Sequence, residues 1–260
     1  MITFRRAVLP CLVAVAVAGV AGCVSSNGSA VTGSRAPASA AVSSAVSSSP
    51  SSSPSGDPLA GLGTYDIITQ AVSDTRAAAS VRVASTGSDA GTSITYSVSI
   101  KKGSGCEGTL SEGATGGYQL VMLGAQAWIK PDLALWKSFG YGAPARLSAV
   151  SGKWVPASMT RSGVAGLSAA CSLDDIIGSE VRLTGLVKGS IGMVDGQRAL
   201  ELTSSTGAAT VWVSDAAAPV LVRIVDTSSG GGTFDFTQYG APVTISPPPA
   251  DQVIASQDLG

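Results

Sequence analysis

The spacing of apolar residues changes several times along this chain, and each change predicts a different element. After residue 63 the apolar and small residues recur at the intervals of one helical face, which predicts a helix with Thr64 as its N-cap. That face consists of Ile67, Ile68, Ala71, Val72, Thr75, Ala78 and Ala79. Over residues 81–83 and 94–100 the period falls to two, which predicts antiparallel strands with one face in water.

Three later segments are apolar at consecutive positions: Tyr118–Leu123, Val211–Val213 and Val220–Val222. A strand that is apolar on both faces must be covered on both. Asp195-Gly196 predicts a tight hairpin turn. The remaining strands are expected at residues 125–129, 180–188, 198–204, 210–214, 220–226 and 233–239.

Short helices are expected between Pro131 and Gly178. Residues 132–139 and a helix beginning at Pro144 fit this pattern, and Ser172 followed by Asp175 is typical of a capping box. The order is therefore a helix, several strands, a helical insertion and more strands in a meander. This order predicts an α+β fold, with one strongly curved antiparallel sheet and helices packed on one side.

The N-terminus has the pattern of a secretory signal. Two arginines, Arg5 and Arg6, precede an uncharged apolar run that is too short to span a membrane, and the run ends at Ala21-Gly22-Cys23. This ending is similar to the bacterial lipobox, so we expect a signal peptide at residues 1–22 and lipidation of Cys23. The alternatives are an ordinary secreted protein with a chance cysteine and a twin-arginine signal, whose pattern fits poorly.

Residues 23–56 are mostly Ser, Ala, Gly, Pro and Val, a composition that cannot bury enough apolar surface to fold. We expect a disordered tether with a reach of about 30 Å. The tether would hold a single folded domain, residues 57–260, close to the outer face of the cell membrane.

Two of the four cysteines, Cys106 and Cys171, remain once the signal peptide and the lipidated residue are set aside. In an extracytoplasmic compartment they are expected to form a disulfide, and two free thiols are the alternative.

The composition excludes several classes of function. The chain has no histidine, which removes the usual general base and metal ligand, and its net charge of −1 provides no basic stripe for nucleic acid. We expect no metal, no cofactor and no catalytic activity. Three short patterns favour structural roles. Gly103–Gly108 is typical of a hairpin turn, and Asp174-Asp175 is typical of a helix cap. In Ser99–Lys102 the first and last residues lie on opposite faces of a predicted strand.

Several strand segments together resemble one family. They are Gly117–Met122, Ala127–Lys130 followed by Trp136, Gly152–Val155, Val194–Gln197, Thr210–Val213, Pro219–Arg223 and Phe234–Val243. In spacing and residue type they resemble the actinobacterial lipoproteins of the LppX/LprG (LprAFG) type, over about residues 64–253. The disulfide pair and the long Ser/Pro tether are departures from the family pattern.

The resemblance implies a LolA-like fold, a half-open β-barrel plugged by helices around an apolar cavity. It also implies binding of an acylated lipid or glycolipid for transport or presentation in the cell envelope, with the membrane reached through the anchor on Cys23. The expected lining residues are Leu120, Met122, Trp128, Trp136, Val211 and Val213. The alternative is a non-catalytic structural or interaction lipoprotein with a filled cavity and a protein partner in the envelope.

Overall fold

The structure, a computed structural model, describes residues 57–159, 163–180, 185–229 and 231–255. The predicted signal peptide, the lipidated Cys23 and the tether lie outside the described residues.

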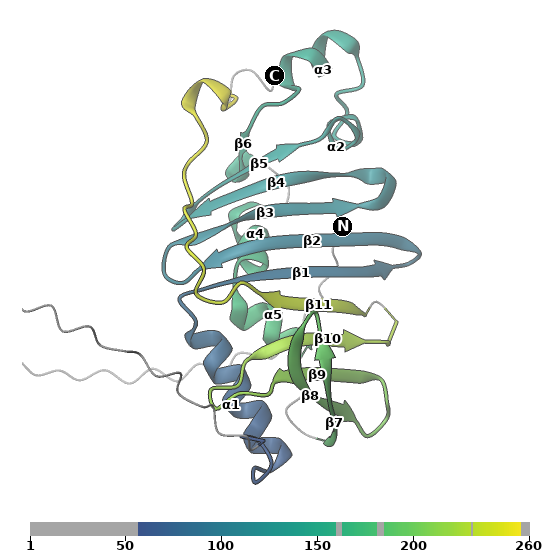
Figure 1. The fold of residues 1–260 in the computed structure, drawn as a ribbon. Coiled ribbons are helices and arrows are strands. Elements are labelled where there is room, and N and C mark those ends of the chain that lie inside the picture. Colours follow the sequence, from purple (N-terminus) through teal and green to yellow (C-terminus); the bar gives the residue numbers. More distant parts are fainter. Residues whose placement is uncertain (1–56, 160–162, 181–184, 230, 256–260) are drawn as a thin grey trace, which may run out of the picture. The chain divides into compact units, whose positions relative to one another are not determined.

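One antiparallel sheet of eleven strands dominates the fold, in the order β6-β5-β4-β3-β2-β1-β11-β10-β9-β8-β7 (Figure 1). The first half of the sheet consists of β1 (Ser80–Asp89), β2 (Thr92–Lys101), β3 (Gly105–Glu112), β4 (Gly116–Leu123), β5 (Gln126–Pro131) and β6 (Val155–Pro156). The second half consists of β7 (Leu186–Val194), β8 (Gln197–Ser204), β9 (Ala209–Ser214), β10 (Leu221–Asp226) and β11 (Gly232–Thr237). Strands β6 and β7 are its two edges, so the sheet does not close.

Each half of the sheet is a meander, and the two halves meet where β1 pairs with β11. Val83 lies opposite Val98 on one side and Phe236 on the other. Elsewhere each strand pairs with its neighbour in the sequence, and β5 pairs with β6 even though α2 and α3 lie between them. Only β6 and β7, the two edge strands, are consecutive in the described sequence without being paired.

Helix α1 (Thr64–Ala77) buries the predicted face, including Ile67, Ile68 and Ala71. Gly63 occupies the N-cap position and makes no side-chain cap, so the prediction of Thr64 as the cap was wrong by one residue. Extended backbone at Gly63 already turns the chain into the helix, and Thr64 therefore takes the first helical position.

The insertion forms the predicted short helices. They are α2 (Leu133–Ser138), α3 (Pro144–Val150), α4 (Gly163–Ala170) and α5 (Leu173–Glu180), with 3₁₀ turns at Gly113–Thr115 (η1), Ala157–Met159 (η2) and Ala250–Gln252 (η3). The side chains of Asp132 and Ser172 accept hydrogen bonds from the amides of Leu135 and Asp175, which cap α2 and α5. The predicted strand at residues 180–188 was wrong at its start, because α5 continues to Glu180 and β7 begins at Leu186.

The main core lies between the inner face of the sheet and the helices. It joins Val83, Phe236 and Leu202 of the sheet to Ile67 of α1 and Ile177 of α5 in one buried cluster. Figure 1 shows α4 and α5 on the same side of the sheet. The predicted fold class is therefore confirmed: the fold is α+β, and it has a strongly curved open antiparallel sheet with helices packed on one side.

The outer face carries a second, smaller cluster, in which Val194, Ala199 and Val222 are buried and Trp212 packs against them. It explains why the segments around Trp212 and Val222 are apolar at consecutive positions: both of their faces are covered.

The C-terminal segment follows the far edge of the sheet. After Pro247–Pro249 it forms the η3 turn, and Val253 then pairs with Trp154 in a parallel bridge beside β6. Ile254 is buried, so this segment contributes to the core as well.

Within the residues that the structure describes, no helix has the length and apolar character needed to cross a membrane.

Candidate functional site

The inner face of the sheet is apolar over most of its width. Residues that lie opposite each other on antiparallel strands share a face. One row across β5, β4, β3, β2, β1 and β11 consists of Ile129, Leu120, Gly108, Val98, Val83 and Phe236. A second row across β10, β9, β8 and β7 consists of Ile224, Val211, Leu202 and Lys188.

Gly108 interrupts the first row for a backbone reason. A Cβ atom at this position would lie 2.1 Å from the carbonyl oxygen of Ser97 on the neighbouring strand. Strands β2 and β3 therefore approach each other where only glycine fits, and the row has a gap between Val98 and Leu120.

Short helices cover this face. Helix α1 packs against β7, β9 and β10, whereas α4 packs against β5 and η2. Leu167 of α4 and Ile176 and Ile177 of α5 are buried in the main core. The sequence of α4, GVAGLSAA, contains no charged residue.

The predicted disulfide between Cys106 and Cys171 is present, and it links the helices that cover this face, α4 and α5, to the sheet. It joins Cys106 on β3 to Cys171, the residue between α4 and α5, with a Cα–Cα distance of 5.6 Å. Cys106 is fully buried, and Cys171 packs on the main core. The junction of the two helices is thereby held at one point on the inner face.

Two tyrosines add polar groups to the apolar interior. The Tyr96 hydroxyl donates a hydrogen bond to the carbonyl oxygen of Ala170 at the end of α4. Burial raises the pKa of Tyr96, and the nearby Tyr118 raises it further. Burial, followed by the charge of Glu112, raises the pKa of Tyr118 to about 12. Both phenols are therefore uncharged at neutral pH, as an apolar interior requires.

A third tyrosine links α1 to the sheet. The Tyr239 hydroxyl donates to the carbonyl oxygen of Leu221 at 2.6 Å and lies 3.4 Å from Thr75 Oγ1. Thr75 Oγ1 in turn accepts a hydrogen bond of 2.9 Å from the amide of Leu221. Burial raises the pKa of Tyr239, while its hydrogen bond with Thr75 lowers it by less.

Lys188 anchors the segment that precedes α1. Its Nζ donates to the carbonyl oxygens of Leu59 (2.7 Å) and Leu62 (3.5 Å). Leu59 is itself almost completely buried, and its amide donates to Asp57 Oδ1 at 2.8 Å. The first described residues of the chain are therefore fixed against the β7 edge.

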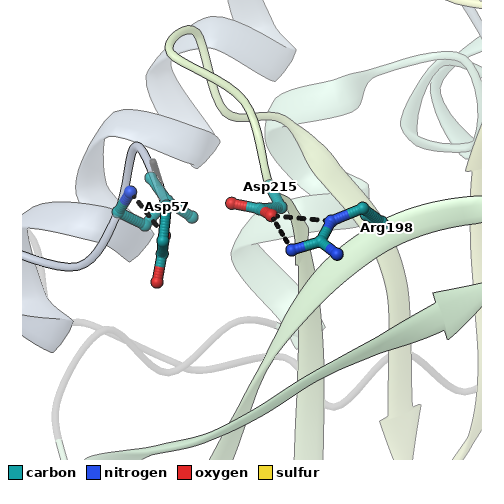
Figure 2. Close-up of polar contacts among 4 residues, drawn as sticks. Asp57, Arg198 and Asp215 are labelled. Atoms are coloured by element: carbon teal, nitrogen blue, oxygen red, sulfur yellow. Dashed lines mark hydrogen bonds and ion pairs between the residues drawn. The ribbon is translucent and has the colours of Figure 1, made fainter. Parts of the chain in front are cut away.

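Figure 2 shows an ion pair near Asp57, formed by Arg198 and Asp215. Arg198 donates from Nε and Nη2 to the same oxygen of Asp215, at 3.1 and 3.0 Å. The Asp215 side chain is only 4% exposed, whereas that of Arg198 is 65% exposed. The other oxygen, Oδ1, has no hydrogen-bond partner among the described residues.

The residues predicted to line a cavity separate into two groups. Leu120, Trp136, Val211 and Val213 are buried in the main core, and Met122 packs against it. Trp128 lies opposite Val121, on the outer face of the sheet, because adjacent strand residues alternate and Ile129 faces inward.

Trp136 extends the core onto α2. Its ring meets Phe139 and Tyr141 edge-on, with centroid distances of 6.0 and 5.0 Å. The side chain is 2% exposed, and no described residue accepts a hydrogen bond from its Nε1.

Sequence reasoning did not select Tyr96, Tyr118 or Lys188 as residues of the candidate site. Tyr96 occupies an apolar position in the alternating strand β2, and this period was the available signal. No sequence signal indicated Lys188, since its contacts are made with backbone carbonyls of residues far away in the chain.

Two surface pockets are lined by described residues. One, of about 440 Å³, lies beside β3, β4 and β5 near Asp132 and Gly152. The other, of about 340 Å³, lies where the end of α1, the β2–β3 turn and the start of α5 meet. Over the described part of the chain, no group of three or more Cys, Asp and Glu residues could hold a metal ion.

No protein-family model matches this chain. No curated protein matches it either.

The chain is similar in structure to several solved proteins at low sequence identity. The lipoprotein LppX of Mycobacterium tuberculosis has 16% identity and a TM-score of 0.45, over 70% of this chain and 98% of that one. An uncharacterized conserved protein from Thermus thermophilus has 11% identity and a TM-score of 0.35, over 73% and 96%. MucB in the MucA/MucB complex of Pseudomonas aeruginosa has 12% identity and a TM-score of 0.31, over 75% and 62%.

Proposed function

We propose that this protein is a membrane-anchored extracytoplasmic lipoprotein that binds an acyl-chain lipid or glycolipid, for transport or presentation in the cell envelope. One observation carries the proposal: the apolar inner face of a wide open sheet is covered by short helices. Two of these helices, α4 and α5, have eight residues each and are fastened to the sheet by a disulfide.

The chemistry of this interior suits a hydrocarbon chain. Leu167, Ile176 and Ile177 of the cover meet aliphatic and aromatic side chains of the sheet. An acyl chain in place of these three side chains would make contacts of the same kind, because burial of apolar surface is not directional. Such a ligand leaves no unpaired polar group behind, provided that its ester groups reach Tyr96, Tyr118 or solvent.

The location rests on the predicted signal at residues 1–22 and the acylation of Cys23. Anchored through this residue, the domain would remain within reach of the membrane that supplies its ligand. Cys23→Ala should release the folded protein to the medium. A variant that stayed in the membrane fraction would contradict the anchor without bearing on the ligand.

The ligand can be tested with two neighbouring residues on opposite faces of β4. Met122 and Leu123 are both partly buried, but Met122 faces the main core and Leu123 the other side. We expect lipid to co-purify with the full-length protein in native mass spectrometry. Met122→Gln should reduce the bound lipid several-fold, and Leu123→Gln should not. A wild-type protein that carries no lipid, or equal loss in both variants, would refute the proposal.

A second candidate is a non-catalytic structural or interaction lipoprotein whose partner is a protein. It is favoured by the close packing of the interior, where Leu120, Val211 and Val213 are at most 3% exposed. Cross-linking in intact cells would then recover one protein repeatedly, and no lipid would be found in the purified sample.

A further inference from the structure

The smaller pocket lies at the corner where the cover meets the sheet. Arg76, near the end of α1, forms one wall, and the β2–β3 turn with Lys101 and Lys102 forms another. The start of α5, with Leu173 and Asp174, closes the third side. The end of α1 and this turn lie at the same end of the central strands, because α1 leads into the start of β1 and Ser80 of β1 pairs with Lys101 of β2 (Figure 1).

Positive charge predominates in this pocket. Its lining includes three cations and one carboxylate, and Arg76 Nε binds that carboxylate, Asp174 Oδ1, at 2.7 Å. Lys101 and Lys102 are exposed, and neither forms an ion pair with any residue that the structure describes. Two ammonium groups are therefore available to an anion, in a chain whose net charge is −1.

The floor of the pocket is apolar and belongs to the interior. Ile100 is a buried residue of the main core, while Cys171 and Leu173 pack against it. Solvent therefore reaches the core residues beside the disulfide at this corner. A ligand here would meet charge at the rim and hydrocarbon below.

The larger pocket differs in charge. It contains one lysine, Lys130, and one carboxylate, Asp132. The Asp132 oxygens accept hydrogen bonds from the amides of Gly117 and Leu135, both at 2.8 Å. Its charges are balanced, so it has no excess of positive charge to attract an anion.

We propose that the pocket formed by Arg76, Lys101 and Lys102 binds the phosphate of a lipid head group, with the acyl chains directed past Ile100 and Leu173 into the interior. This inference rests on the proposed lipid-binding function and adds the ligand class: an anionic, phosphate-bearing lipid. Lys101 and Lys102 supply the charge, and Gly103, Ser104 and Gly105 of the turn line the same space.

The test compares two lipids and two variants of the full-length protein in detergent. Phosphatidylglycerol and diacylglycerol with identical acyl chains are titrated, and bound lipid is measured by native mass spectrometry. Lys101→Ala/Lys102→Ala removes the two unpaired cations. Lys137→Ala/Arg146→Ala removes two exposed cations of α2 and α3 and is the charge-matched control.

We expect the wild-type protein and the control to prefer phosphatidylglycerol by about tenfold, the effect of two exposed charge contacts. The Lys101/Lys102 variant should lose this preference and still bind diacylglycerol. Equal affinity of the wild-type protein for both lipids, or equal loss of preference in both variants, would overturn the head-group site and leave lipid binding intact.

Titration with glycerol phosphate distinguishes a lipid head group from a free phosphate compound as the ligand of this pocket. If neither lipid binds but glycerol phosphate binds in a manner that depends on Lys101 and Lys102, the lipid source is refuted and the anion site is retained. If neither the lipids nor glycerol phosphate bind, both the head-group site and the proposed function are refuted.

Discussion

Loss of the link between Cys106 and Cys171 should lower the free energy of unfolding by about 4 kcal/mol. The disulfide closes a loop of 65 residues, and loop-closure entropy for that length gives this value. The loop includes β4 and β5, α2 to α4 and the junction with α5. In this view the disulfide stabilises the fold mainly by restricting the unfolded chain, and reduction removes that restriction.

Urea unfolding of Cys106→Ala/Cys171→Ala, followed by tryptophan fluorescence, measures the effect. With a slope of about 2 kcal/mol/M, the midpoint should fall by about 2 M. The reduced wild-type protein should show the same shift, and because it keeps both sulfur atoms, that shift contains no contribution from a cavity. Reductant should not affect the variant, which has no disulfide to reduce. A shift below about 0.5 M in both samples would refute the reasoning, because the unfolded chain would not then be restrained by the link.

Three further perturbations test the packing. Thr75→Val removes the acceptor for the buried amide of Leu221 and should cost about 1–3 kcal/mol in urea unfolding; Thr69→Val, on the exposed face of the same helix, is its control. Phe236→Ala should cost about 3–5 kcal/mol, since the ring is 1% exposed where the two halves of the sheet meet. The free energy of unfolding should fall as the pH rises from about 10 to about 12, because Tyr118 loses its proton at a lower pH in the unfolded chain than in the folded one. Tyr118→Phe should reduce this dependence of the free energy of unfolding on pH.

Each of these results has a clear opposite. Equal effects of the two threonine substitutions would mean that the buried amide finds another acceptor. A loss of less than about 1 kcal/mol at Phe236 would mean that the seam is not tightly packed. A pH dependence identical in the wild-type protein and Tyr118→Phe would assign the alkaline transition to other groups, such as Tyr96 and Tyr239, whose pKa values are also raised by burial.

Period and turn chemistry predicted most of the elements. The alternation from Ile94 to Ile100 belongs to β2, and the Asp195-Gly196 turn, with positive φ at both residues, connects β7 to β8. The predicted strand began too early, at residue 180, because period alone does not mark the boundary between the end of α5 and the start of β7. The helix cap at Ser172 was readable because its chemistry is local.

The site was less accessible to prediction. Leu120 and Trp128 belong to two adjacent apolar strands, and only the register shows that they face opposite sides. The pocket at Arg76, Lys101 and Leu173 joins three segments far apart in the sequence, so no single motif contains it. Sequence pattern describes faces of elements, whereas a pocket depends on how those elements meet.

The pairing of β1 with β11 has a consequence for the order of folding. Val83 and Phe236 are 153 positions apart, whereas the strands within each meander are mostly joined by short turns. Local contacts form faster than distant ones, because less chain entropy is lost in closing a short loop. Each meander can therefore assemble early, and the seam between them should be the rate-limiting step, so substitutions at Val83 or Phe236 should slow refolding more than equally destabilising ones within β8 or β9.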